Sequence, residues 1–144
     1  MPNRYPLARL AEIRALRATG AAVDLAEALA GERDAEAEVA EARAAVEAAR
    51  VAARAATLVA DAAGASSAMW AVVQREAYAI RLRRDVERAI ARVTAREAEL
   101  AEWRATVAQA RETMISTRAD QKVVERHREQ WEDAAKKKRE RRED

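Results

Sequence analysis

Apolar residues recur every seven positions along most of this chain, in the pattern of a coiled-coil seam. In the second half, the a positions are Ala79, Val86, Val93, Leu100, Val107, Met114 and Gln121, and the d positions are Leu82, Ala89, Arg96, Trp103, Ala110, Thr117, Val124 and Trp131. In the first half, the a positions are Leu25, Val39, Val46, Ala53 and Ala60, and the d positions are Ala28, Ala35, Ala42, Ala49, Ala56 and Ala63. No window shows the period-two alternation of a strand. The pattern therefore predicts two long helices.

Glycine and proline indicate where these helices begin and end. They occur at Pro2, Pro6, Gly20, Gly31 and Gly64, and neither occurs after Gly64. Glycine readily adopts the left-handed conformation that ends a helix, and Ser66 or Ser67 can cap the next one. We therefore predict an all-α fold with one domain over residues 1–144, an antiparallel coiled-coil hairpin that bends near Gly64. Its expected parts are helix 1 at about 6–63, a turn at about 64–66 and helix 2 at about 67–140.

The heptads also predict which residues face each other. A bend at Gly64 pairs Val46 with Leu82, Val39 with Ala89 and Leu25 with Trp103. It also sets Glu32 opposite Arg96, and these two charges either pair or both extend outward. Roughly the last 20 residues of helix 2 would then overhang without an intramolecular partner. In that overhang, Trp131 either lacks a partner or packs against Tyr5 and Leu7.

Composition agrees with this fold and restricts the chemistry. The chain contains about 40 alanines, 27 Lys or Arg and 25 Asp or Glu, all favourable for helices except aspartate. It has no cysteine, one histidine (His127) and no glycine-rich phosphate loop, so we predict no enzymatic activity, no metal and no cofactor. No apolar run approaches the roughly 18 residues of a membrane span, and we expect a cytoplasmic protein.

Two regions carry more apolar surface than a two-helix seam needs. Leu7, Leu10, Ile13 and Leu16 recur every three residues, which predicts that part of this face is exposed to a partner. Trp70 follows the bend, where it either anchors a partner or caps the hairpin tip. Tyr78 and Leu82 lie four residues apart on one face nearby, either as seam residues or as part of a contact patch.

The chain begins with Tyr5-Pro6-Leu7, followed by Leu10 and an IRxxR segment, which is Ile13 to Arg17. This start resembles that of FliJ/YscO-family proteins. At the end, the residues similar to the YscO branch, which serves type III secretion, are Lys122, Glu125, His127, Arg128, Trp131 and then Arg139 to Asp144. The region after the bend departs from the flagellar pattern, because it lacks phenylalanine.

This resemblance implies a non-enzymatic central stalk. Family members are antiparallel helical hairpins whose joined termini insert into a hexameric secretion ATPase and whose shaft connects it to the export gate; some also bind secretion chaperones. Carried onto this chain, the implied ATPase-binding residues are Leu7, Leu10, Ile13, Arg14, Arg17, His127, Arg128 and Trp131. The implied export-gate residues are Trp70, Tyr78 and Leu82. The expected partners are the ATPase hexamer, the cytoplasmic domain of the gate and secretion chaperones.

Other functions stay open from sequence alone. A hairpin of this kind also suits a generic coiled-coil adaptor that binds a chaperone or self-associates, and the same heptads support a dimer of extended helices. The basic cluster between Lys136 and Arg142 suits nucleic acid, but Glu140, Glu143 and Asp144 dilute it and the net charge is only +2. We therefore predict no nucleic-acid partner. A membrane-surface helix is disfavoured too, because the apolar face is mostly alanine.

Overall fold

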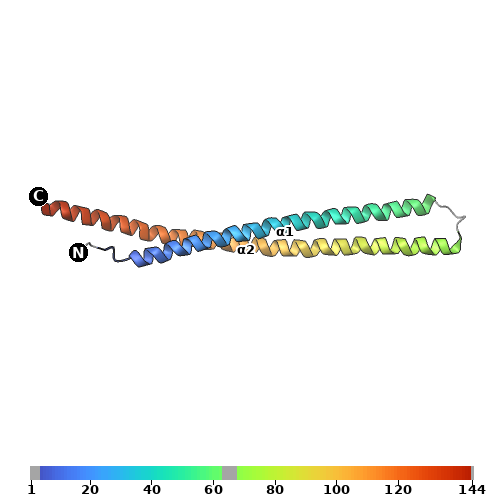
Figure 1. Ribbon diagram of the computed structural model, residues 1–144, viewed down its shortest axis with the longest axis horizontal. Helices are drawn as coiled ribbons and strands as arrows, with labels where there is room; N and C mark the ends of the chain where they lie inside the picture. The colour runs from blue at the N-terminus through green and yellow to red at the C-terminus, as the bar shows by residue number, and fades with distance from the viewer. Residues whose placement is uncertain (1–3, 63–67, 144) are drawn as a thin grey trace. The chain divides into compact units, whose positions relative to one another are not determined.

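Two long helices account for nearly all of the chain. The computed structural model describes residues 4–62 and 68–143, with helix α1 at Ala8–Ala62 and helix α2 at Met69–Glu143 (Figure 1). These described residues contain no strand, and the two helices pack against each other, so the predicted all-α hairpin is confirmed. The predicted turn at Gly64 and the capping residues Ser66 and Ser67 lie outside the described residues, as does Ala63.

Local hydrogen bonds show how each helix begins. The Ala8 N–H donates to the Tyr5 carbonyl at 3.2 Å and the Ala11 N–H to the Leu7 carbonyl at 2.9 Å, so a turn leads into α1. Pro6 suits this turn because its ring fixes φ and it has no N–H to satisfy. At the other helix, the Ala71 N–H donates to the Ala68 carbonyl at 2.9 Å. Alanine's high helix propensity supports both helices along their length.

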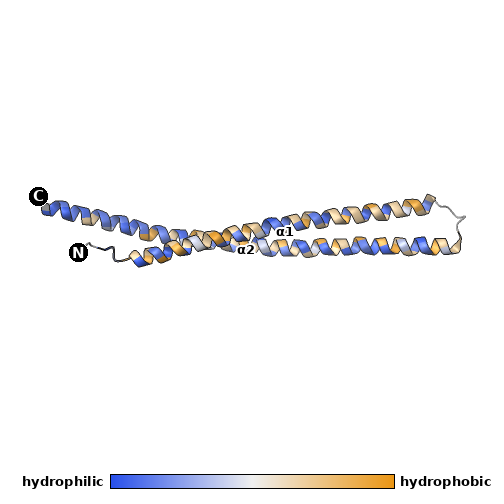
Figure 2. Cartoon of the chain, viewed as in Figure 1, coloured by the Kyte–Doolittle hydropathy of each residue, from blue (hydrophilic) through white to orange (hydrophobic). Residues whose placement is uncertain are grey.

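Contacts divide the chain into two units, and each unit contains one segment of α1 and one segment of α2. Unit 1 comprises residues 1–30 and 105–144, and unit 2 comprises residues 31–104. The prediction of one domain over residues 1–144 stays a prediction. In both units a segment of α1 packs against a segment of α2, and apolar and polar residues are interspersed along each helix (Figure 2).

The buried residues follow the predicted heptads. In unit 2 they are Ala35, Val39, Ala42, Val46, Ala89 and Leu100, all at predicted a or d positions. In unit 1 they are Tyr5, Ala18, Ala21, Ala28, Val107 and Val124, and all of these except Tyr5 fall at a or d of the same heptads. Because most of these side chains are small, the core is narrow and contains no large side chain that is fully buried among the described residues. The heptad positions predicted to form the seam are thus the ones that the structure buries.

The pairing of the two helices differs from the prediction by nearly one heptad. Trp103 was expected against Leu25, but its ring lies over Gly31, where a Cβ added to the glycine would be 2.6 Å from the Trp103 Cε3 atom. Val46 was expected against Leu82, yet it lines a groove with Ile90 and Val93. Val39, expected against Ala89, forms a buried cluster with Leu100. The predicted register is therefore wrong, although the seam positions themselves are right.

The interhelical charges follow the corrected register. Arg96 pairs with Glu38 of α1 at 2.9 Å and with Glu99 of its own helix at 2.8 Å. It does not pair with Glu32, which was one of the two arrangements expected from the sequence. Glu32 instead lies 3.6 Å from Arg104, whose guanidinium also reaches Glu36 at 3.6 Å. Hydrogen bonding to Glu99, together with the charge of Glu38, raises the pKa of Arg96. All these side chains except Glu32 keep at least 40% of their surface exposed, so each pair contributes little stability.

Candidate functional site: a terminal cluster and a tip surface

Tyr5, just before α1, meets the C-terminal part of α2 in a cluster of side chains. This side chain is buried, and its hydroxyl lies 2.9 Å from Nδ1 of His127 and 3.4 Å from the Val124 carbonyl, to which it donates. Its ring meets the Trp131 ring edge to face, with centroids 5.6 Å apart. The packing preference of aromatic rings and a buried hydroxyl's need for a partner both favour this arrangement. We call Tyr5, His127 and Trp131 the terminal cluster.

The terminal cluster shortens the predicted overhang. Trp131 was left between two interpretations, and the structure gives it Tyr5 as a partner. The expected overhang of roughly 20 residues is therefore too long, because Trp131 lies within it and has a partner. The register explains the difference, because a shift of nearly one heptad moves α1 farther along α2. The stretch that continues α2 beyond Trp131 carries six exposed cations, which are Lys136, Lys137, Lys138, Arg139, Arg141 and Arg142.

The remaining residues implied for ATPase binding lie in unit 1, as the terminal cluster does. Leu7 is half-buried, whereas Leu10 and Ile13 are exposed large apolar side chains. Arg14 is occupied, since its Nη1 donates to the Asp120 carbonyl at 2.9 Å and ties the two helices together. Arg17 is exposed.

Arg128 is held on the surface of α2 by a neighbouring carboxylate. Its Nε donates to Glu132 at 2.8 Å, one helical turn away. This hydrogen bond, with the charge of Glu132, raises the pKa of Arg128. The side chain is therefore a fixed positive charge next to the terminal cluster.

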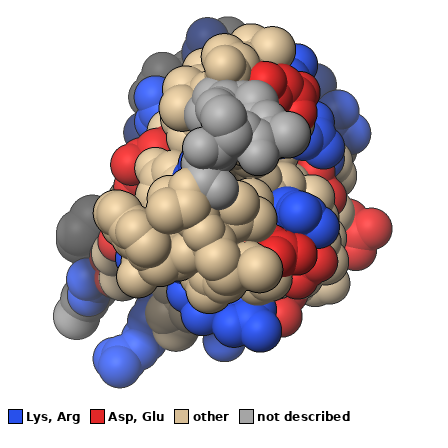
Figure 3. Space-filling model, turned by 90° about the vertical axis from the view of Figure 1, so that its right-hand side faces the viewer, with Lys and Arg blue, Asp and Glu red and all other residues tan. Residues whose placement is uncertain are grey.

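The beginning of α2 forms a second apolar surface in unit 2. Trp70 is 72% exposed, and the exposed apolar residues around it in sequence on the two helices are Leu58, Val59, Met69, Val72 and Val73. Figure 3 faces this end of unit 2, and uncharged side chains occupy much of the surface there. Exposed large apolar side chains that gather in one region are typical of an interaction surface. We call these six residues the tip surface.

The structure separates the other two residues implied for gate binding. Tyr78 is exposed, and the Arg81 guanidinium lies over its ring, 5.9 Å from the centroid. Leu82 is half-buried at its d position and belongs to the seam. Of the three candidates, Trp70 and Tyr78 are thus accessible, and Leu82 mainly supports the helix pairing.

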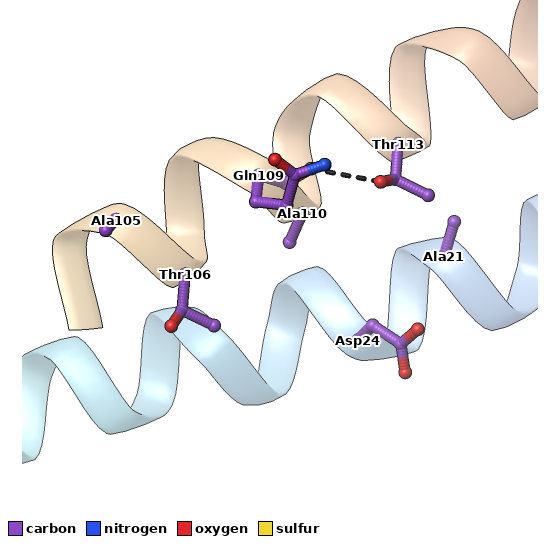
Figure 4. Close-up of a pocket in the computed structure, with 7 residues that line it drawn as sticks. All are labelled: Ala21, Asp24, Ala105, Thr106, Gln109, Ala110 and Thr113. Carbon is purple, nitrogen blue, oxygen red and sulfur yellow. Dashed lines mark hydrogen bonds between the residues drawn. The ribbon is translucent and has the colours of Figure 1, made fainter. Parts of the chain in front are cut away.

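Shallow grooves run between the helices inside each unit. One in unit 1 has a volume of about 480 Å³ and is lined by Ala21, Asp24, Ala105, Thr106, Gln109, Ala110 and Thr113 (Figure 4). The Thr113 hydroxyl donates to the Gln109 carbonyl at 3.1 Å, so this polar group is satisfied within its own helix. Ala21 points toward α2, and the Asp24 carboxylate points away from it (Figure 4). Small side chains shape the groove, and they bring no reactive group into it.

The described residues present no cluster for metal or acid–base chemistry. None of their His, Cys, Asp and Glu side chains form a group of three or more that could hold a metal ion. No polar or charged residue is buried among those whose burial is described. Within the described part of the chain, no helix is long and apolar enough to cross a membrane.

Comparison with known proteins adds no relative. No family model, no curated protein and no solved structure matches this chain. Its function therefore has to be argued from its own residues.

The sequence did not reveal two features, one in the tip surface and one in the pairing of the helices. It treated Trp70 alone, whereas Met69 and Val73 beside it are also exposed. Their signal was available, because apolar residues directly after a bend fall outside the a and d positions. It also did not identify Gly31 as the site that receives the Trp103 ring, and a heptad pattern contains no signal for such a fit.

Proposed function

We propose that this chain is a non-enzymatic stalk of a bacterial type III secretion system. In this proposal, the end that carries both termini inserts into a hexameric secretion ATPase, and the tip surface contacts the export gate. The FliJ/YscO resemblance of the two ends motivates the proposal. Secretion chaperones are a further proposed class of partner.

The terminal cluster is the observation that carries the proposal. A stalk that enters a ring with both termini needs its two helices joined at that end, and Tyr5 joins them through His127 and Trp131. Arg14 adds a second tie through the Asp120 carbonyl. Leu10, Ile13 and Arg17 then remain available to the surrounding subunits. In this arrangement, contacts between the helices hold this end together, and exposed apolar and charged side chains are left to bind the surrounding subunits.

Charge supports the same end as the ATPase-binding one. The segment beyond Trp131 carries six cations between Lys136 and Arg142, and Arg128 lies next to the terminal cluster. Clustered cations on an exposed helix favour an acidic protein surface and accelerate association with it. A ring of identical subunits with acidic side chains around its opening would present such a surface six times.

An asymmetric stalk in a six-fold ring would also have a mechanical consequence. One chain cannot match six identical subunits at once, so it would engage only some of them at any time. Preferential binding to one subunit conformation would shift the ring toward that conformation. We therefore expect the chain to promote either assembly of the ring or its ATP turnover.

The proposal is tested by binding measurements with reciprocal variants. In one variant Leu10 and Ile13 are both replaced by Asp, and in the other Trp70 is replaced by Ala. We expect the first to weaken binding to the cognate secretion ATPase by about tenfold or more and to leave gate binding unchanged. The second should do the reverse. If wild-type chain binds neither partner, or if both variants bind the ATPase equally well, the proposal is wrong.

A further inference from the structure

One exposed face of α1 in unit 1 carries large apolar side chains outside the a and d positions. The residues of this face are Arg9, Leu10, Ile13, Leu16, Arg17, Gly20, Val23 and Asp24. In the heptad that buries Ala18 and Ala21, they fall on positions c, f and g, of which c and f lie away from α2 and g flanks the seam. All eight are exposed, and Leu16 keeps 72% of its surface accessible. We call this the outer face.

Gly20 makes a notch in the middle of the outer face. A Cβ added there would meet nothing within 4 Å, so no neighbouring side chain of the described structure fills this space. Glycine is a poor helix former, and no turn or close contact in the structure requires one at this position. A notch beside exposed leucine, isoleucine and valine side chains suits the insertion of an apolar side chain from another helix.

We propose that the outer face binds the outer face of a second copy of this chain, with the two helices antiparallel about a two-fold axis. In one register, Ile13 of each copy fits the Gly20 notch of the other. Leu10 then faces Val23, Arg9 faces Asp24, and Leu16 lies against the stem of Arg17. Each of these contacts occurs twice, as two-fold symmetry requires.

Charge complementarity argues for a second copy as the occupant. The apolar residues of the outer face are bounded by Arg9 at one end and Asp24 at the other, so the face is complementary to itself only when reversed. The Asp24 carboxylate points away from α2, where a partner helix can reach it (Figure 4). Opposite charges that flank an apolar strip fix both the direction and the register of paired helices.

The size of the outer face predicts a weak dimer. It contributes eight residues from each copy, whereas a standard stable interface uses about 20–30 residues per partner. Dimerisation should therefore depend on concentration in the micromolar range or above. Because Leu10, Ile13 and Arg17 also belong to the proposed ATPase-binding end, dimer and ATPase complex would exclude each other. That consequence rests on the proposed function, but the dimer itself does not.

Sedimentation of the full chain tests the dimer directly. The expected mass rises with concentration from 15.9 kDa toward twice that value. Leu16→Glu should abolish the rise, whereas Leu58→Glu, a matched change at a residue that is 68% exposed in unit 2, should leave it intact. A mass of one chain at every concentration, or equal loss with both variants, would overturn the proposal. This assay contains no ATPase, so its failure is distinct from failure of the proposed function.

A charge exchange tests the orientation. Arg9→Glu alone places a second carboxylate opposite Asp24, and Asp24→Arg alone places two guanidinium groups together, so each variant should stay monomeric. Mixing the two single variants should restore a dimer, because each copy then supplies the charge that the other needs. The double variant should also dimerise like the wild type. No recovery in either case would exclude this antiparallel pairing.

Disulfide trapping tests the register. The chain has no cysteine of its own, so single-cysteine variants give an unambiguous readout. A mixture of Ile13→Cys and Gly20→Cys chains should form the mixed disulfide readily under mild oxidation. The control mixture of Leu58→Cys and Gly20→Cys chains should not. Equal trapping in both mixtures would show random collision and would contradict the proposed register.

Discussion

Replacing either helical glycine by alanine should have opposite effects, and this contrast tests the helix pairing. Alanine is favoured over glycine in a helix interior by about 0.8–1 kcal/mol. At Gly20 nothing lies within 4 Å of the added Cβ, so Gly20→Ala should stabilise the chain by about that amount. At Gly31 the Cβ would overlap the Trp103 ring, 2.6 Å from Cε3, so the ring must move.

The size of the Gly31 effect follows from the burial of Trp103. The residue is 40% exposed, so more than half of its surface is covered. A ring displaced from α1 would expose on the order of 100 Å² of apolar surface, which costs about 2.5 kcal/mol. After the gain in helix propensity is subtracted, Gly31→Ala should lower the free energy of unfolding by about 1.5 kcal/mol. Once Trp103 is replaced by Ala, Gly31→Ala should instead stabilise by about 1 kcal/mol.

Urea unfolding followed by far-UV circular dichroism measures these differences in a double-mutant cycle. The cycle should give a coupling of about 2–3 kcal/mol between positions 31 and 103. Gly20→Ala serves as the internal control for helix propensity. If Gly31→Ala stabilises the wild-type chain as much as Gly20→Ala does, the ring does not lie over the glycine and the register is wrong.

Three further substitutions examine the terminal cluster and the core. Tyr5→Phe keeps the ring contact with Trp131 but removes the hydroxyl, and we expect it to lower the free energy of unfolding by about 0.5–1.5 kcal/mol in the same urea assay; a neutral effect would show that the buried hydroxyl's partner contributes nothing. Val39→Ala should destabilise by about 1–3 kcal/mol because it opens the cluster with Leu100. Exposed Val59→Ala should change the stability by less than about 0.5 kcal/mol, and equal effects at both valines would contradict the assigned seam.

The heptads predicted the fold and the buried positions but could not predict the register. A slip of one heptad exchanges one a or d residue for another, and along α1 most of these residues are alanine. Burial by itself therefore hardly distinguishes the two pairings. What distinguishes them is size, because the Trp103 ring lies over Gly31, where a Cβ would overlap it. The fit of a large ring over a glycine depends on the tertiary structure, and the heptad pattern does not predict it.

The candidate surfaces were predictable to different degrees. Exposed Leu10 and Ile13 were expected, because their three-residue spacing leaves the seam, and Trp70 was expected to lie near the bend. The contact of Tyr5 with Trp131 was one of two alternatives from sequence, since it depends on the register. Leu82 was ambiguous from sequence, and its partial burial in the structure favours the seam. The spacing of apolar residues thus predicted where the surfaces lie, whereas their contacts depend on how the two helices pair.

ATP turnover by the cognate hexameric secretion ATPase, measured with and without this chain, tests the central claim most directly. The account predicts that wild-type chain changes either the turnover or the assembly of the hexamer. The chain in which Leu10 and Ile13 are both replaced by Asp should have much less effect at the same concentration. Unchanged turnover and unchanged assembly at concentrations that saturate the wild-type chain would contradict the stalk function.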